Sequence, residues 1–448
     1  MLDTSAALER TSALIDRARK AGADAADVVY IADSSESIQV RLGQLEDVER
    51  SENEHIGLRV FVGKSSASIG SSDLGEEGLS ELAALAVAMA RAAPEDQYAG
   101  LAPAELLARE FPAGLDLADG AEPGPAALRE KALTAEDAAR AVNGVTNSEG
   151  AGASAGRGVF ALATSHGFSG AYESTSHGLS ASVIAGEGSG MQRDYAWRSA
   201  RHAMDLLPPD EIGALAGARA VARLNPGRLK SGSMPVVFDP RVGGTLIGHL
   251  LGAISGSAIA RRASFLLDKD GAQLFDSAVS ILDDPHRPRA SRSRPFDGEG
   301  LPTAPRALVE SGKLTGWLME SASARQLGLS PTGHASRGGN GAPGVSASNV
   351  HVAPGSMSPA DLMADIKDGV YVTELIGQGV NGVTGDYSRG ASGFRIVNGE
   401  IAGPVAEFTV AGNLIDMFAA LVPANDIEWY RAINVPTLRV DGMMVAGD

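Results

Sequence analysis

The stretch of sequence that decides the fold class is residues 159–199, which read VFALATSHGFSGAYESTSHGLSASVIAGEGSGMQRDYAWRS. Short runs of apolar and aromatic residues alternate there with Gly and Ser, which is typical of antiparallel strands joined by turns. We assign four strands to this stretch: Val159–Thr164, Phe168–Ser174, Leu179–Ala185 and Gln192–Ser199. One helix is predicted to end near Ala141, before the strands, and another covers Pro208–Leu224. Helices and strands come in blocks, which indicates an α+β fold.

The residues before this stretch follow the same order of helix, strands and helix. Apolar residues recur at helical spacing in the opening segment, at Leu8, Leu14, Ile15 and Ala18. Strands are expected at 27–31, 37–42, 55–62 and 66–71, with Gly63-Lys64 as a hairpin turn between the last two, and a helix at Glu76–Ala93. The recurrence predicts a weak internal repeat.

The chain is predicted to contain two domains. Residues 1–230 form an N-terminal α+β domain of helices and antiparallel strands, whose sub-regions, about 1–93 and 125–230, are joined by a Pro- and Ala-rich connector. Residues 231–448 consist of short segments with many glycines, which favours a mainly β, barrel-like C-terminal domain with a few helices. Val242–Ile259 is the clearest helix of that domain.

Composition excludes several classes of protein. The 448 residues are 44% hydrophobic, which is enough to bury the cores of two or three domains. A net charge of −17 argues against a nucleic-acid partner, because such binding depends on Lys and Arg contacts with phosphates. There are no cysteines, so neither a disulfide nor a thiolate metal site can form in this chain.

The sequence predicts a soluble, cytoplasmic protein with no membrane segment. Residues 1–22 lack the basic start, apolar block and small-residue cleavage site of a secretory signal, and they are interpreted as a helix. The most apolar later stretch, Leu246–Ala260, is shorter than the roughly 20 residues that span a membrane, and it contains His249.

Several motifs match known patterns without the context that those patterns need. Gly152–Gly156 fits G-x-S-x-G, but a nucleophile elbow requires a helix after the serine, and here a strand follows. Gly377–Gly382 fits G-x-G-x-x-G, yet the glycines beyond it disfavour the helix of a dinucleotide site. Asp268–Gly271 and Asp297–Gly300 are interpreted as solvated turns, with calcium or acid/base carboxylates as the alternative.

None of the eight histidines has the spacing of a zinc-hydrolase motif, because no His-Glu-x-x-His occurs. His334 together with Arg337 could bind a peptide carboxylate, although a structural or surface role is the simpler interpretation. The glycine-rich loops around 338–344 and 377–393 are candidates for lining a substrate chamber, since loops often carry binding residues.

A run of features in the C-terminal half resembles the TldD/PmbA family, also labelled modulator of DNA gyrase. The matching segments are Val236–Pro240 leading into the helix, Phe296–Gly300, Ser311–Gly316, Thr332–His334, Ser348–Val350, Pro354-Gly355, Val383–Ser388, Gly390–Gly393, Asn398–Ile401 and Pro404-Val405. The N-terminal half resembles the family more loosely, through Ile56–Val60 and the hairpin after it. The resemblance therefore covers nearly the whole chain.

In the catalytic TldD branch of this family, a helix carries His-Glu-x-x-x-His, and a distant cysteine completes the metal site. Alignment of the Gly-His pair places Gly244 at the first histidine, Thr245 at the glutamate and His249 at the second histidine. Two of the three positions have changed, and the chain has no cysteine. The resemblance therefore implies the PmbA, or TldE, branch, with Gly244, Thr245 and His249 as degenerate motif positions and no metal or other cofactor bound to this chain.

The resemblance further implies a non-catalytic subunit of a metallopeptidase complex that degrades or processes small, unfolded peptides. The expected partner is a TldD-type catalytic subunit, which holds the metal ion, zinc, in a heterodimer; a homodimer is the alternative assembly. The acidic charge suits an indirect effect on DNA gyrase better than direct DNA binding. The alternative function is a stand-alone homodimeric peptidase or hydrolase with an unrecognised active site.

Overall fold

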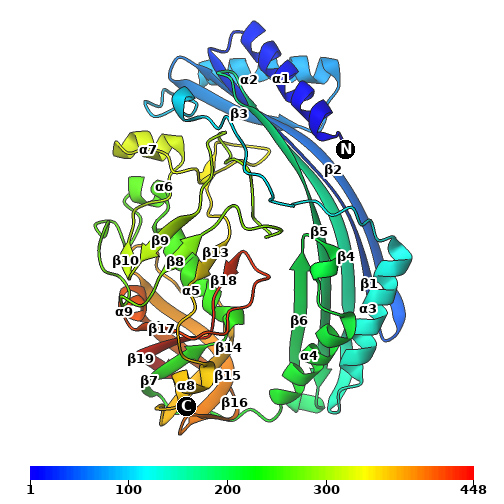
Figure 1. Ribbon diagram of the computed structural model, residues 1–448, viewed down its shortest axis with the longest axis vertical. Coiled ribbons are helices and arrows are strands. Elements are labelled where there is room, and N and C mark those ends of the chain that lie inside the picture. The colour runs from blue at the N-terminus through cyan, green and yellow to red at the C-terminus, as the bar shows by residue number, and fades with distance from the viewer.

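Each half of the chain is built around its own β-sheet in the computed structural model, which describes residues 1–448 (Figure 1). The N-terminal half contains one six-stranded antiparallel sheet of long, curved strands, and its helices lie on the outer, convex side (Figure 1). The C-terminal half lies on the side toward which these strands curve (Figure 1). The α+β class predicted from the sequence is confirmed.

The N-terminal sheet is assembled from two successive units with the same order of elements. The first unit consists of α1 (Thr4–Lys20), β1 (Ala25–Arg41), β2 (Gln44–Val62), β3 (Ser65–Ser71) and α2 (Glu76–Ala92). The second consists of α3 (Pro125–Arg140), β4 (Val145–Thr164), β5 (Ser169–Ala185), β6 (Gln192–Ala200) and α4 (Pro209–Ala222). The strand order is β3-β2-β1-β4-β5-β6, so the first strands of the two units meet at the centre. This arrangement confirms the predicted internal repeat.

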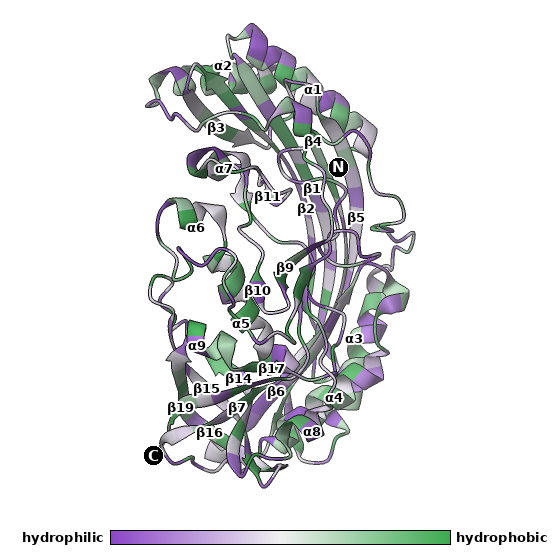
Figure 2. Ribbon diagram, turned by 60° about the vertical axis from the view of Figure 1, so that its left-hand side comes forward, coloured by the Kyte–Doolittle hydropathy of each residue, from purple (hydrophilic) through white to green (hydrophobic).

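Alternating side chains of the sheet form the cores under the helices. Val28 and Leu58 pack under α1 and α2, whereas Ile38 and Leu179 pack under α3 and α4. The helices carry both hydrophilic and hydrophobic residues along their length in Figure 2, as expected of helices with one face on a sheet. Tertiary burial of one face, more than helix propensity, therefore holds these helices.

The strands are longer than the sequence predicted. The segments at 168–174 and 179–185 merge into the single strand β5, and those at 27–31 and 37–42 merge into β1. The Gly- and Ser-rich residues 145–158 also belong to a strand, β4. These polar stretches stay extended because β1, β4 and β5 each have a partner on both sides, which satisfies their backbone groups. Pairing in the sheet outweighs the weak strand propensity of Gly and Ser.

Five strands of the C-terminal half form a closed barrel. They are β7 (Gly232–Phe238), β14 (Asp368–Ile376), β15 (Asp386–Val397), β16 (Glu400–Asn413) and β19 (Leu438–Ala446). Their order is β16-β15-β14-β7-β19, and pairing of β19 with β16 closes the ring. The β7–β14 pair is parallel, whereas β7 and β19 are antiparallel, with Phe238 opposite Leu438. The barrel-like character predicted for this half is confirmed.

The remaining elements are short. A second sheet, ordered β10-β9-β8-β13-β18, consists of Lys313–Leu314 (β10), Arg306–Glu310 (β9), Ile281–Asp283 (β8), Val350–Val352 (β13) and Ile433–Asn434 (β18). Other strands are β11 (Ala335–Ser336), β12 (Gly344–Val345) and β17 (Leu421–Pro423). The helices are α5 (Pro240–Ala253), α6 (Gly256–Ala260), α7 (Ser321–Leu327), α8 (Pro359–Met363) and α9 (Leu414–Ala419). Single 3₁₀ turns lie at Ala104–Leu106, Gly188–Gly190 and Ala203–Asp205.

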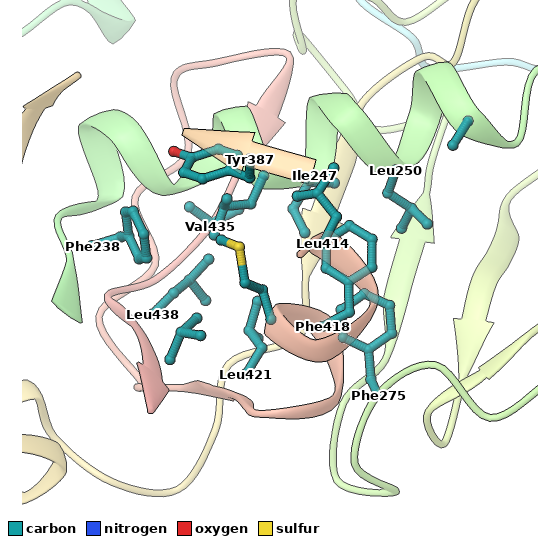
Figure 3. Close-up of a cluster of buried hydrophobic side chains, with 14 of the residues drawn as sticks. Phe238, Ile247, Leu250, Phe275, Tyr387, Leu414, Phe418, Leu421, Val435 and Leu438 are labelled. Carbon is teal, nitrogen blue, oxygen red and sulfur yellow. The ribbon is translucent and has the colours of Figure 1, made fainter. Parts of the chain in front are cut away.

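The apolar face of α5 packs into the largest hydrophobic core of the molecule (Figure 3). Ile247 and Leu250 from α5 belong to this core together with Phe238 of β7 and Phe418 of α9. The rings of Phe275 and Phe418 stack with their centroids 4.9 Å apart and an interplanar angle of 26°. This packing fixes α5, and with it the residues that the sequence singled out.

The helix predicted at Val242–Ile259 is interrupted, which corrects its boundary. α5 ends at Ala253, and α6 begins at Gly256. Between them, the carbonyl of Ile254 accepts a hydrogen bond from the Leu318 N–H at 2.9 Å, and the Gly256 N–H donates to the Leu318 carbonyl at 2.7 Å. Pairing with a distant segment therefore replaces a helical turn, which periodicity alone does not reveal. No helix in the chain combines the length and apolar character needed to cross a membrane.

A buried ion-pair network formed by Asp27, Arg59, Arg337 and Glu299 joins the two halves. Asp27 on β1 accepts hydrogen bonds from Arg59 Nε of β2 at 2.6 Å and from Arg337 Nη2 of the C-terminal half at 3.0 Å. Arg59 Nη2 also lies 3.9 Å from Glu299 Oε1. All four side chains are less than a tenth exposed, so the charges compensate one another away from water.

Candidate functional site

The three positions that the family motif singles out lie on one helix, α5. The helix begins after Asp239, whose side chain accepts a hydrogen bond from the Arg241 N–H, and Pro240 occupies its first turn. It is α-helical without interruption from Pro240 to Ala253. Side chains at 244 and 249 are five residues apart and therefore point about 140° away from each other in a regular helix. The helix as folded does not direct both positions to one point.

Gly244 and Thr245 provide no group for metal binding or proton transfer. A Cβ at position 244 would face Ile433 and lie 3.4 Å from its carbonyl oxygen. Thr245 Oγ1 donates to the carbonyl of Val242 at 2.7 Å, so its hydrogen bond is made within the helix itself. Neither residue replaces the function of a histidine or a glutamate.

His249 is half-buried and lies edge-to-face against Tyr387, with the ring centroids 6.1 Å apart. Its Nε2 atom is buried and has no hydrogen-bond partner in the chain. Burial, and secondarily the positive charge of Arg389, lowers the pKa of His249. The imidazole is therefore neutral at pH 7, and Nε2 has no protein partner that would determine whether this nitrogen carries the proton.

A pocket of about 280 Å³ opens beside His249, between α5 and the loop that follows β14. Its lining includes Phe265, Gln378 and Val380 but no carboxylate and no second histidine. A protein zinc site needs at least three nitrogen, oxygen or sulfur ligands, and one imidazole does not provide them. Nowhere in the chain are three or more His, Asp or Glu side chains placed to hold a metal ion. The residues around His249 do not fit a catalytic metal.

The glycine motifs lie in strands and loops. Gly152–Gly156 is inside β4, paired on both sides, so Ser154 has no strand-to-helix turn. Gly377–Gly382 belongs to the loop between β14 and β15, and no helix follows it. In the other glycine-rich loop, Gly339 packs on the N-terminal sheet so closely that a Cβ at Gly57 would lie 2.0 Å from its carbonyl oxygen. The positions of Gly152–Gly156 and Gly377–Gly382 therefore support a structural role for both of these glycine motifs.

The acidic motif at Asp297 and Glu299 is buried, so the prediction of a solvated turn is wrong there. The two residues are only 1% and 4% exposed. The Asp297 carboxylate accepts three backbone N–H groups, that of Ala335 among them, and Glu299 accepts from the N–H and hydroxyl of Ser321. Two of these donors, the N–H groups of Glu299 and Leu301, are local, whereas Ala335 and Ser321 come from other segments, which spacing within the motif cannot indicate. The other acidic motif, Asp268–Gly271, is at the surface as predicted.

His334 and Arg337 do not form a joint anion site. His334 Nε2 lies 3.2 Å from Asp283 Oδ2, and its Nδ1 lies 2.9 Å from Thr332 Oγ1. Arg337 pairs instead with Asp27, which is 310 positions away in the sequence. Asp27 is not among the residues predicted from the sequence, because no local pattern marks a partner at that separation.

We expect Asp297→Asn to flatten the dependence of stability on pH. Burial, and after it the charge of Glu299, raises the pKa of Asp297 to about 6, from an ordinary value of 3.8. The folded state therefore holds a proton that the unfolded state has released, so the stabilising contribution of Asp297 is complete below pH 4 and is lost as the pH rises through 6. Relative to the variant, the wild type should therefore lose on the order of 2–3 kcal/mol of its free energy of unfolding between about pH 4 and pH 7.

Urea unfolding at several pH values measures this difference, and Asp268→Asn at the surface provides the control. A difference that stays constant or rises with pH would contradict the buried, protonated state of Asp297.

The sequence matches all three domains of one metallopeptidase family. Residues 26–90 match the PmbA/TldA metallopeptidase domain 1, residues 118–224 the central domain and residues 231–447 the C-terminal domain. The chain is 39% identical to metalloprotease PmbA of Escherichia coli O157:H7, over 95% of this chain and 92% of that protein. It is 38% identical to the metalloprotease PmbA homolog of Haemophilus influenzae, over 98% of this chain and 96% of that protein.

Solved structures share the fold over nearly its whole length. A Bacteroides thetaiotaomicron protein described as a candidate modulator of DNA gyrase superposes with a TM-score of 0.90 at 27% identity, over 98% of both chains. TldE from Thermococcus kodakarensis superposes with a TM-score of 0.86 at 21% identity, over 98% of this chain and 100% of that one. The second likeness is one of fold.

Proposed function

The chain belongs to the PmbA/TldD metallopeptidase family, and we propose that it is the non-catalytic, TldE-type subunit of a two-subunit metallopeptidase. A TldD-type partner would supply the metal ion, zinc, and the general base, and the complex would hydrolyse small or unfolded peptides. The observation that carries the proposal is the isolation of His249 on α5, with no second ligand and no carboxylate beside it. An activated water at zinc requires three protein ligands and a base, and this helix offers one ligand.

A partner subunit reconciles two facts about the chain. Its relatives are named metalloproteases, whereas the helix that bears the motif positions lacks the groups for metal chemistry. If the catalytic groups come from a related chain, the conserved fold still serves to assemble the complex and to bind peptide. The role of this chain is then to bind and position the substrate.

The decisive experiment combines this chain with a related chain from the same proteome that carries an intact His-Glu-x-x-x-His. Cleavage of an unstructured peptide is measured for each subunit and for the mixture, and metal content is measured for each. We expect the mixture to cleave in a chelator-sensitive way, with about one metal in the partner and none in this chain. Chelator-sensitive cleavage by this chain alone would instead establish the stand-alone homodimeric hydrolase.

We expect Gly244→His combined with Thr245→Glu to give the isolated chain no peptidase activity. The new imidazole would point toward Ile433, whereas that of His249 lies against Tyr387, so the two rings do not converge in the regular helix. A third ligand would still be missing. Peptide cleavage and bound zinc are measured beside the matched variant Gly244→Ala with Thr245→Ala. Chelator-sensitive cleavage by the rebuilt chain alone would contradict its assignment as the non-catalytic subunit.

A further inference from the structure

A cavity lined by arginines lies where the edge strand β6 meets two loops of the C-terminal half. Its volume is about 230 Å³, and its lining comes from residues 198–201, 205, 287–291 and 429–431. Five of the lining residues are arginines, Arg198, Arg201, Arg287, Arg289 and Arg431, against a single carboxylate, Asp205. These arginines gather around one cavity although the chain as a whole has a net charge of −17. The cavity therefore favours an anion.

Four of the five arginines already have protein partners. Arg198 pairs with Glu428, and Arg289 pairs with Asp116 and Asp205. Arg201 donates to the carbonyls of Thr175 and Ser291, and Arg431 donates to the carbonyl of Arg241 and the hydroxyl of Tyr430. These four guanidinium groups are held in place; carboxylates offset the charges of Arg198 and Arg289, whereas Arg201 and Arg431 bond only to neutral acceptors and contribute positive potential to the cavity. Nε of Arg201 is also buried without an acceptor, but Arg287 is the one arginine of the five whose guanidinium makes no ion pair or hydrogen bond at all.

The guanidinium of Arg287 makes neither an ion pair nor a hydrogen bond within the chain. Its Nη1 atom is buried without an acceptor, and the group lies over the Trp429 ring, 4.4 Å from the centroid. Burial lowers the pKa of Arg287, and the charge of Asp284 opposes this only in part. Arg287 is half-buried, and leaving its buried Nη1 without an acceptor is costly; an acceptor from outside the chain would remove that cost.

The chemistry of the cavity selects a carboxylate attached to an apolar group. A planar guanidinium matches a carboxylate through two parallel hydrogen bonds. Beside it, the indole of Trp429 is 47% exposed and offers an apolar surface next to the charge. A cavity of this volume can hold the last residue of a peptide but is too small to receive the surface of a folded protein. We propose that this cavity binds the C-terminal carboxylate of a peptide, with Arg287 as the anion-binding residue and Trp429 against the terminal side chain.

This inference rests on the proposed function, since it names the part of a peptide substrate that this subunit would hold. A site for a chain end selects short peptides, because a short chain presents one free carboxylate for every few residues and its end is not confined by a fold. The preference for small, unfolded peptides would then arise in part from this subunit and not only from the partner's catalytic groups.

The test is calorimetric titration of the full-length chain with an N-acetylated tripeptide that ends in leucine, as the free acid and as the amide. We expect the free acid to bind at least about tenfold more tightly than the amide, and Arg287→Gln to abolish that preference. Arg287→Lys, which keeps the charge but not the fork, should retain part of it. Arg395→Gln removes one exposed, distant arginine and serves as the control for net charge.

Equal affinity for acid and amide, or wild-type preference in a correctly folded Arg287→Gln variant, would overturn the inference. Inorganic phosphate, titrated in parallel, would also overturn it if phosphate bound more tightly than the peptide acid. Cleavage by the mixture with the TldD-type chain is measured separately. If the mixture cleaves but no carboxylate preference is found, only the cavity assignment fails; if the preference is found but no mixture cleaves, only the proposed function fails.

Discussion

Replacement of Asp27 by asparagine is expected to lower the free energy of unfolding by about 3–5 kcal/mol. The Asp27 carboxylate is 4% exposed and compensates two buried guanidinium groups, those of Arg59 and Arg337. Asparagine keeps the shape of the side chain but removes the charge, so both arginines remain buried with only Glu299, 3.9 Å from Arg59, as a counter-charge. Breaking a buried pair costs much more than a surface pair contributes, because the remaining charge is desolvated.

Chemical denaturation measures this loss, and Asp33→Asn on the same strand is the matched control because Asp33 is exposed. Because Arg337 belongs to the C-terminal half, the variant should also weaken the contact between the halves, and proteolysis should then cut the chain faster at residues 223–231, between α4 and β7. A loss below about 1 kcal/mol would show that the network contributes no more than a surface ion pair.

Phe418→Ala is expected to destabilise the barrel by about 3–5 kcal/mol. The Phe418 side chain is fully buried in the core shared by α5, α9 and the barrel, where it stacks on Phe275 (Figure 3). Truncation removes the apolar contacts of the ring and leaves a cavity that the closed ring of strands cannot easily collapse.

Ile401→Ala provides the control for Phe418→Ala, because Ile401 is on barrel strand β16 but is 48% exposed. The midpoint of urea unfolding should fall sharply for Phe418→Ala and change little for Ile401→Ala. Similar midpoints for the two variants would mean that the packing around α5 does not limit the stability of the C-terminal half.

The sequence was most informative where structure is set by local patterns. The helix expected at Glu76–Ala93 is present as α2, and the Gly63-Lys64 turn joins β2 and β3. It was least informative where distant segments decide the outcome. β5 continues through polar residues because β4 and β6 flank it, and the helix at 242–259 breaks because Leu318 pairs with the backbone between α5 and α6. Neither neighbour is visible in a local window.

In the candidate site, too, the residues set by local sequence patterns could be predicted and those set by distant contacts could not. Gly244, Thr245 and His249 could be placed on one helix from the sequence, since they lie within two turns of each other. The burial of Asp297 could not be predicted from the sequence, because the hydrogen-bond donors to its carboxylate include the N–H of Ala335 in another segment. Arg287 also carries no local signal, because Trp429, the ring on which it lies, is far along the chain. Residues that act through tertiary contacts escape motif analysis even in a chain whose family can be identified.

The closure of the barrel has a consequence for biosynthesis. β7 ends at Phe238, and the β19–β16 pair that closes the ring uses Met444–Ala446, so a growing chain must add just over 200 residues after the first strand before the ring can close. At about 5–20 residues per second, this interval lasts roughly 10–40 s on the ribosome. During it, β7 lacks its β19 neighbour and exposes an unpaired edge that can aggregate. The N-terminal sheet is complete by Ala200 and can fold in the meantime. Expression at low temperature, or with chaperones that shield unpaired strands, should therefore improve the yield of the folded protein.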